Sequence, residues 1–289
     1  MNKKIMNIVI AFELIICVIC FSARAPGNAA EALGALGAVA AVDRGEAHEV
    51  VEKAAEAFEA AGPIYIELEK IIEETIADDA LDEDSEYDAE ETEASLGEIN
   101  AYSDQLRALL NDISELPDDS ANSEGKTVRA TREYLNSLLN ITTDLSSLIK
   151  YGIELNEAMV AMDGMYVETE SYQEYADAIW TTTNEVGGLL RNIQPPVYLA
   201  ISHDDFANCI NDFRVFAEDF YYAAELEDPL RIYSCIFRLD RIARMFEICG
   251  DDLNADLMLQ IRQAERRLNG PIAVLHNELT QNLAILINA

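Results

Sequence analysis

Apolar residues recur at spacings of three and four along most of this chain, the pattern of amphipathic helices. No stretch shows the alternation of apolar and polar residues that is typical of strands. The pattern predicts helical segments over 46–77, 96–113, 126–162, 165–193, 200–225, 229–249, 251–268 and 272–286. Connections between them are short, so neighbouring helices are expected to pack antiparallel.

Glycine, proline and capping residues predict where these helices begin and end. Gly62-Pro63 is expected to interrupt the first helical segment, because proline lacks an amide and restricts the residue before it. Ser202, followed by Asp205, and Asp228-Pro229 both have the composition of a helix start. Gly250 is expected to end one helix, and Gly270-Pro271 is expected to break the last.

The fold class predicted is all-α, an antiparallel bundle of long amphipathic helices after an N-terminal signal peptide. Five parts follow from the pattern. They are a signal peptide (1–25), an Ala/Gly-rich tether (26–45), an N-terminal helical segment (46–77), an acidic linker (78–94) and the helical bundle (95–289). The segment 46–77 either packs on the bundle or stands apart from it across the linker.

The first 25 residues have the layout of a secretory signal peptide. A basic head, Asn2-Lys3-Lys4, precedes a mostly apolar run over 5–21, and Ala23-Arg24-Ala25 supplies the small residues of a cleavage site. Two alternatives are an uncleaved membrane anchor and a lipoprotein lipidated at Cys20. The apolar run is shorter than the about 20 residues of a spanning helix, which favours cleavage and a secreted or extracytoplasmic product, with surface retention also compatible.

Composition makes this a strongly acidic chain. The 289 residues hold 54 acidic and 20 basic side chains, for a formal charge of −34. Such a charge repels nucleic acid and anionic lipid head groups, so neither is an expected partner. No stretch after the leader is long and apolar enough to predict a membrane span once the signal is cleaved.

Acidic residues are densest in the linker, which has two interpretations. The main one is a solvated connection, because like charges repel and few apolar residues are present. The other is a weak, unspecific site for a divalent cation. An EF-hand loop beginning at Asp82 would need glycine sixth and glutamate twelfth, and the chain has Tyr87 and Glu93 there.

The helices 200–225 and 229–249 are joined by a short turn, so opposed residues should have numbers that add up to about 455. This register makes Cys209–Cys249 the one internal disulfide that the geometry allows, since Cys235 lies too far from either along the helices. Export makes oxidation feasible. The alternative is three reduced, buried thiols at Cys209, Cys235 and Cys249 that act as small apolar residues.

The same register predicts interhelical ion pairs. Asp212 is expected near Arg241 or Arg244, and Asp219 is expected near Arg238. Exposed pairs of this kind contribute only about 0–1 kcal/mol each. A docking strip for an anionic ligand is the functional alternative for the arginines. The aromatic residues Trp180, Tyr221, Tyr222 and Tyr233 are expected to fill the core, with a pocket lining as the alternative.

Candidate catalytic and metal-binding sets are weak. Only three histidines are present, His48, His203 and His276, and no Glu-x-x-His pair or paired cysteine motif accompanies them. The contiguous Ser202-His203-Asp204 does not aim its side chains at one another on a helix. No phosphate loop or dinucleotide fingerprint is found, so no cofactor is expected.

These observations favour a secreted or cell-surface acidic helical bundle that acts by binding an unknown protein or surface partner, or by structure, without catalysis. The alternative function is an extracytoplasmic bundle of sensor type that binds a small ligand. It would require an apolar cavity between helices, with tyrosine and arginine side chains converging on it.

Overall fold

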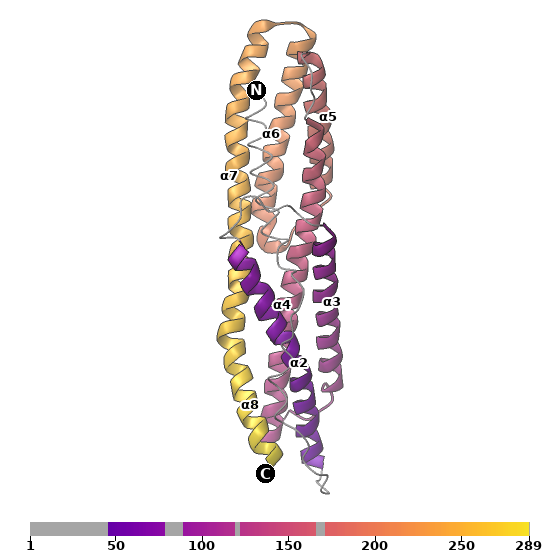
Figure 1. Cartoon of the computed structure of the whole chain (residues 1–289), viewed down its shortest axis with the longest axis vertical. Helices are drawn as coiled ribbons and strands as arrows, with labels where there is room; N and C mark the ends of the chain where they lie inside the picture. Colours follow the sequence, from indigo (N-terminus) through magenta and orange to yellow (C-terminus); the bar gives the residue numbers. More distant parts are fainter. Residues whose placement is uncertain (1–45, 79–88, 119–121, 166–170, 289) are drawn as a thin grey trace. The chain divides into compact units, whose positions relative to one another are not determined.

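The computed structural model describes residues 46–78, 89–118, 122–165 and 171–288, and these ranges form an all-α helical bundle (Figure 1). The predicted fold class is confirmed at that level. The predicted signal peptide and tether lie outside the described residues. The α-helices are α2 (Glu46–Asp78), α3 (Ala89–Asp112), α4 (Ser123–Val160), α5 (Tyr172–Leu190), α6 (Ala200–Glu225), α7 (Pro229–Arg267) and α8 (Ala273–Asn288).

Three short turns of other helical types connect them, namely η1 (Ala161–Met165), η2 (Val197–Leu199) and η3 (Leu268–Ile272). The helices contribute to two compact units. Unit 1 contains Ser147–Gln260, and unit 2 contains the described parts of Ser22–Ile76, Ala94–Ser146 and Ile261–Ala289. Helices α4 and α7 therefore each supply residues to both units.

Unit 2 is held together by an aromatic cluster from three helices. Phe58 of α2 lies 5.2 Å from the ring of Tyr134 in α4 and 4.9 Å from the ring of His276 in α8, between ring centroids. The Tyr134 hydroxyl is 3.0 Å from His276 Nδ1. Between α3 and α4, the buried Ser103 hydroxyl donates to Thr142 Oγ1 at 2.8 Å. The segment 46–76 thus packs on helices far from it in the sequence.

Unit 1 has a phenylalanine core between α6 and α7. Phe206 and Phe213 of α6 both contact Phe246 of α7, at 6.2 and 5.6 Å between ring centroids. Tyr175 of α5 packs edge-on against Phe220 of α6. All five residues are buried, so the apolar stripes of these helices face one another as their spacing predicts.

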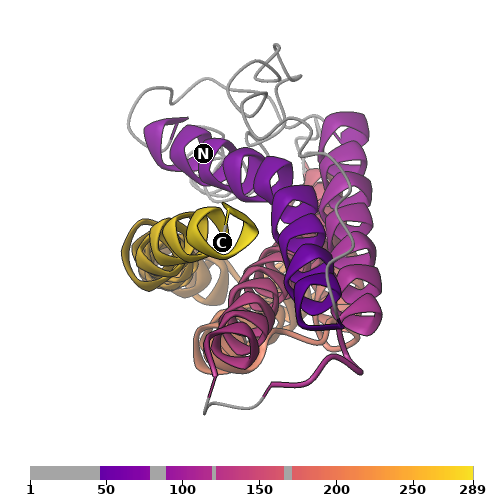
Figure 2. The same ribbon diagram turned by 90° about the horizontal axis from the view of Figure 1, so that it is seen from below.

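Two predicted helix ends are wrong. Helix α2 continues through Pro63, and α7 continues through Gly250 to Arg267. Ala61 and Ile64 are buried on either side of Pro63, so tertiary packing offsets the hydrogen bond that proline removes, and Figure 2 shows α2 changing direction along its length. Gly250 is itself buried and has no left-handed conformation, so it acts as a packing residue.

The predicted helix start at Asp228 is confirmed, whereas the one at Ser202 is wrong. Asp228 Oδ1 accepts hydrogen bonds from the amides of Leu230 and Arg231, at 3.1 and 3.2 Å. Helix α6 begins earlier, at Ala200, and the Ser202 hydroxyl donates to the carboxylate of Asp256 in α7. The predicted break at Gly270-Pro271 takes the form of the π-helical turn η3, within which Pro271 lies.

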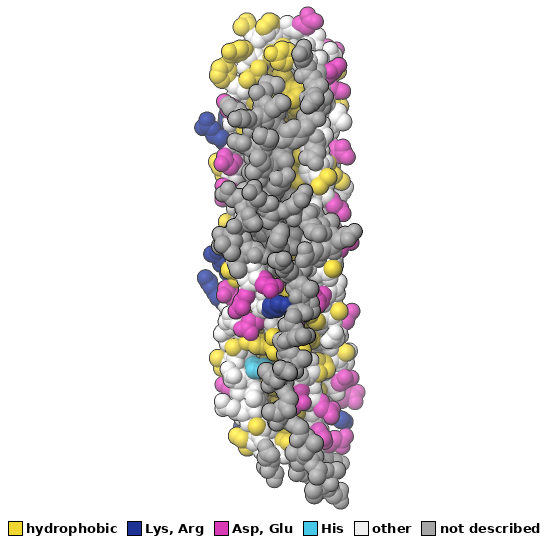
Figure 3. All heavy atoms as spheres, in the orientation of Figure 1, with side chains coloured by type: hydrophobic (Ala, Val, Ile, Leu, Met, Phe, Trp, Pro, Cys, Tyr) yellow, Lys and Arg dark blue, Asp and Glu magenta, His cyan; other side chains and the backbone are white. Residues whose placement is uncertain are grey.

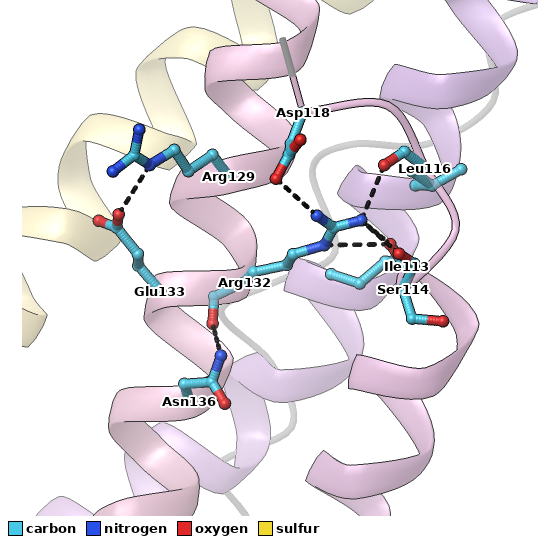
Figure 4. Close-up of polar contacts among 8 residues, drawn as sticks. All are labelled: Ile113, Ser114, Leu116, Asp118, Arg129, Arg132, Glu133 and Asn136. Atoms are coloured by element: carbon cyan, nitrogen blue, oxygen red, sulfur yellow. Dashed lines mark hydrogen bonds and ion pairs between the residues drawn. The ribbon is translucent and has the colours of Figure 1, made fainter. Parts of the chain in front are cut away.

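Arg132 of α4 closes the C-terminal end of α3 (Figure 4). Its Nη2 donates to the carbonyl oxygens of Ile113, Ser114 and Leu116, each at 2.7 Å, and its Nη1 donates to Asp118 Oδ2 at 2.9 Å. Ile113, Ser114 and Leu116 lie in the turn that follows α3, so one guanidinium group donates to three carbonyls of that turn. This contact fixes the α3–α4 connection in unit 2.

Replacing Arg132 with alanine should lower the free energy of unfolding by about 2–3 kcal/mol, because charge-assisted hydrogen bonds to the carbonyls of the turn after α3 are lost. Arg129→Ala is the matched control. Arg129 also forms an ion pair on α4, with Glu133, but that pair is exposed and should contribute less than about 1 kcal/mol. Urea unfolding of both variants measures the difference, and equal losses would contradict the role given to Arg132.

Candidate interaction surface

The α6–α7 hairpin of unit 1 positions the candidate interaction surface. Its turn contains Glu227, with φ of 51°, directly before the capping residue Asp228. The structure pairs Cys209 with Cys249 as a disulfide and joins Asp219 to Arg238 by an ion pair. With these two contacts, the residues that lie opposite each other on α6 and α7 are shifted by about two positions from the pairing that the turn predicted.

Among the ion pairs of the described residues, none joins Asp212 to Arg241 or Arg244. Asp219 pairs with Arg238. Asp212 lies seven residues before Asp219, and Met245 lies seven residues after Arg238, so Met245 lies opposite Asp212 in the antiparallel pair. Arg241 and Arg244 precede that position and point around the helix, away from α6. No second ion pair forms in this register because methionine, and not arginine, stands seven residues after Arg238.

Helix α7 carries two apolar stripes. The first consists of Cys235, Leu239, Ile242 and Phe246, all buried against unit 1. The second lies on the opposite side, because each residue turns an α-helix by about 100°. We call it the outer face of α7, and its residues are Leu230, Tyr233, Phe237, Arg241, Arg244 and Ile248.

The outer face of α7 is open to solvent. Leu230 is 83% exposed, Tyr233 is 64% exposed, Phe237 is 69% exposed and Ile248 is 59% exposed. The rings of Tyr233 and Phe237 pack on each other, with centroids 5.5 Å apart. Single exposed apolar residues are common, but a row of large ones along one helix makes this face a candidate interaction surface.

The aromatic residues expected in the core lie largely at the surface. Trp180, Tyr222 and Tyr233 are 41%, 52% and 64% exposed, so that prediction is wrong for these three. Tyr222 and the 65% exposed Leu226 extend the apolar surface of the hairpin onto α6. Figure 3 shows hydrophobic side chains gathered where α6 meets α7.

Positive charge interrupts the outer face of α7 at Arg241 and Arg244. Neither arginine forms an ion pair with any carboxylate in the described part of the chain. Arg231 and Arg238, at the edge of this face, are paired with Asp228 and Asp219. The sequence prediction treated Arg238, Arg241 and Arg244 as ion-pair partners of α6 and missed the exposed apolar residues between them. Their spacing from Leu230 to Ile248 was the available signal.

The histidines of the described core serve as structural groups. A hydrogen bond of 3.1 Å joins the Tyr151 hydroxyl to His203 Nδ1, within unit 1. Ser202 turns to Asp256 and His203 turns to Tyr151, so Ser202-His203-Asp204 is not assembled as a catalytic set. Burial lowers the pKa of His203, although the backbone of Leu190 and the charge of Asp204 act in the opposite direction.

His203 should make unit 1 less stable in mild acid. The unfolded chain takes up a proton below the ordinary histidine pKa near 6.5, whereas the folded chain resists it because burial disfavours the charged imidazole and lowers its pKa. Stability from this residue is therefore complete above pH 6.5 and falls as the pH drops through the lowered folded pKa. His203→Gln should lose less stability than wild type between pH 7.5 and 5, measured by thermal unfolding. An unchanged pH dependence would contradict this role.

The remaining candidate sites concern cations and membranes. Among the described residues, no group of three His, Cys, Asp or Glu side chains could hold a metal ion. Positions 79–88 of the acidic linker, with the proposed cation ligands Asp82 and Asp84, lie outside the described residues, and α3 already begins at Ala89. Within the described ranges, no helix combines the length and the apolar character needed to cross a bilayer.

Comparison with known proteins assigns no family to this chain. No family model matches it, no curated protein matches its sequence, and no solved structure matches its fold.

Proposed function

We propose that this protein is exported, acts without catalysis as a secreted or cell-surface acidic helical bundle, and works by binding through the outer face of α7. The row of exposed large apolar residues from Leu230 to Ile248 carries the proposal. Export is supported by the basic head, apolar run and Ala-x-Ala motif of the first 25 residues. Hydrogen bonds of the buried His203 and the partly buried His276 with tyrosine hydroxyls support a non-catalytic role.

The outer face of α7 is self-complementary, so we assign its partner as a second copy of this chain. In an antiparallel pair of α7 helices, Leu230 lies opposite Ile248 of the second copy, and Phe237 lies opposite Arg241 of the second copy. Tyr233 then lies opposite Arg244 of the second copy. One apolar contact and two contacts of an arginine with an aromatic ring thus repeat on both sides of a two-fold axis.

A parallel pair would be unfavourable, because it would bring Arg241 of both copies together. The antiparallel pair avoids this and covers each arginine with a ring. Cation–π contacts contribute about 0.5–2 kcal/mol each, depending on how far water is excluded. A single helix face gives a small interface, so the association is expected to be in the micromolar range or weaker.

Sedimentation velocity over about 1–500 µM tests the proposal on the mature chain. Mass should rise toward twice that of the monomer as concentration increases. The full sequence has a formal net charge of −34, so copies of the chain repel one another. Association should therefore be stronger at about 0.5 M NaCl than at about 0.02 M, because salt screens this repulsion. A monomer at every concentration and salt level would reject the second copy as partner. An acidic helix of another protein would then be the occupant to seek.

A further inference from the structure

The second surface with binding character in unit 1 is a polar groove between α5 and α6, on helices other than α7. Its volume is about 700 Å³, within the usual range for small-molecule sites. Asn184 and Gly187 line it from α5, and Arg191 lines it from the position directly after α5. Asp204, Asn211 and Arg214 are among the residues that line it from α6. We call it the α5–α6 groove.

The two helices approach closely at the middle of this groove. A Cβ atom at Gly187 would lie 3.6 Å from the side chain of Ile210, which is van der Waals contact. Gly187 and Ile210 therefore lie opposite each other on the two helices. Asn211 is the next residue of α6. The antiparallel pairing follows from this contact and from that of Tyr175 with Phe220.

The side chains of both groove arginines extend along their helices toward Gly187 and Asn211, at the middle of the groove. Arg191 Nε donates to the carbonyl oxygen of Gly187 at 2.7 Å, which draws the side chain back along α5. Arg214 donates through Nε and Nη2 to Asn211 Oδ1, each at 3.3 Å, which draws it back along α6. The two guanidinium groups thus converge on the middle of the groove from opposite ends.

Neither guanidinium group is neutralised there. Across the ranges that the structure describes, Arg191 and Arg214 form no ion pair, in a chain where acidic residues far outnumber basic ones. Within the same ranges, both terminal nitrogens of Arg191 and Nη1 of Arg214 donate to no protein acceptor. These are the donors that a carboxylate accepts in paired hydrogen bonds.

We infer that the α5–α6 groove binds a small hydroxylated monocarboxylate, with Arg191 and Arg214 on its carboxylate. With Asp204, the charged side chains that line the groove have a net charge of +1, which suits a monoanion better than a phosphate dianion. Three amide side chains also line the groove, those of Asn184, Asn208 and Asn211. Asn184 Nδ2 donates to Trp180 and Asn211 Oδ1 accepts from Arg214, which leaves Asn184 Oδ1 as an acceptor, Asn211 Nδ2 as a donor and Asn208 as both for the hydroxyl groups of a ligand. The ligand class is therefore a sugar acid.

Isothermal titration of the mature protein with gluconate tests this inference, with sorbitol as the neutral polyol and phosphate as the inorganic anion. Gluconate should bind, and sorbitol should bind at least about tenfold more weakly, because hydrogen bonds to a charged partner are the strong ones. Equal binding of sorbitol, tighter binding of phosphate, or no heat from gluconate up to about 20 mM would overturn the assignment.

Variants separate the groove from the general charge of the protein. Arg191→Gln and Arg214→Gln should each weaken gluconate binding at least about tenfold. Arg266→Gln removes the same charge from the last turn of α7, outside the groove and the outer face of α7, and should leave gluconate binding unchanged. Equal effects of all three substitutions would show that gluconate responds to net charge alone. Because the groove and the outer face of α7 use different residues, the result for gluconate does not depend on the result for self-association.

Discussion

Phe237→Lys should convert the self-associating protein to a monomer. In the antiparallel pair, this substitution removes a ring from Arg241 of the second copy and puts a cation in its place, twice in each dimer. Two lost cation–π contacts and two new repulsions should raise the dissociation constant at least about 30-fold. The fold should persist, because Phe237 is 69% exposed and supports no core contact.

Substitutions of opposite charge at position 237 distinguish a second copy of this chain from an acidic partner. Phe237→Glu should weaken association less than Phe237→Lys, because glutamate lies opposite an arginine in the antiparallel pair. Adding Arg241→Glu to Phe237→Lys should restore association, because the new lysine of one copy then lies opposite the new glutamate of the other. Ile201→Lys is the control, since Ile201 is also exposed but belongs to α6. A Phe237→Lys protein that still forms dimers in sedimentation would contradict the proposed contact.

Loss of the Cys209–Cys249 pair should cost unit 1 about 4 kcal/mol. The cysteines are 40 residues apart. In the chain-entropy model, a cross-link that closes a loop of this length lowers the entropy of the unfolded chain, and the resulting stabilisation is about 4 kcal/mol. For a chain of this size the loss corresponds to a fall of about 10 °C in Tm. Thermal unfolding of a Cys209→Ala, Cys249→Ala double variant measures it.

A reducing agent gives the matching test. It should lower the Tm of wild type and leave that of the double variant unchanged. Cys235→Ala is the control, because Cys235 is a buried free thiol whose pKa is raised by burial, and it forms no cross-link. The exported protein should show one free thiol after denaturation. Three free thiols would contradict the disulfide and would count against an oxidising compartment.

Local signals predicted those elements of the fold that depend on neighbours in the sequence. Asp228 and Pro229 start α7 because the cap is formed by the next few amides, whatever the rest of the protein does. Pro63 and Gly250 misled the prediction because both lie inside long helices whose packed neighbours offset the local cost. Contacts such as that of Phe58 with His276 cannot be read from helical spacing alone.

The candidate sites were less predictable for a related reason. Helical spacing shows that α7 has two apolar stripes, but the neighbouring helices decide which stripe is buried. The stripe through Leu239 is buried, and the one through Phe237 is exposed. The groove arginines, Arg191 and Arg214, come from separate helices and share no sequence motif. Only the pairing of α5 with α6 brings them together.

Cross-linking of single cysteine variants tests the central claim most directly, in a background where Cys235 is alanine. Leu230→Cys and Ile248→Cys proteins, mixed under mild oxidation, should form a covalent dimer that joins position 230 of one copy to position 248 of the other. Each variant alone should remain largely uncross-linked, because its two cysteines lie about 27 Å apart along the helices. Cross-links within each single variant and none in the mixture would contradict the antiparallel α7 pair.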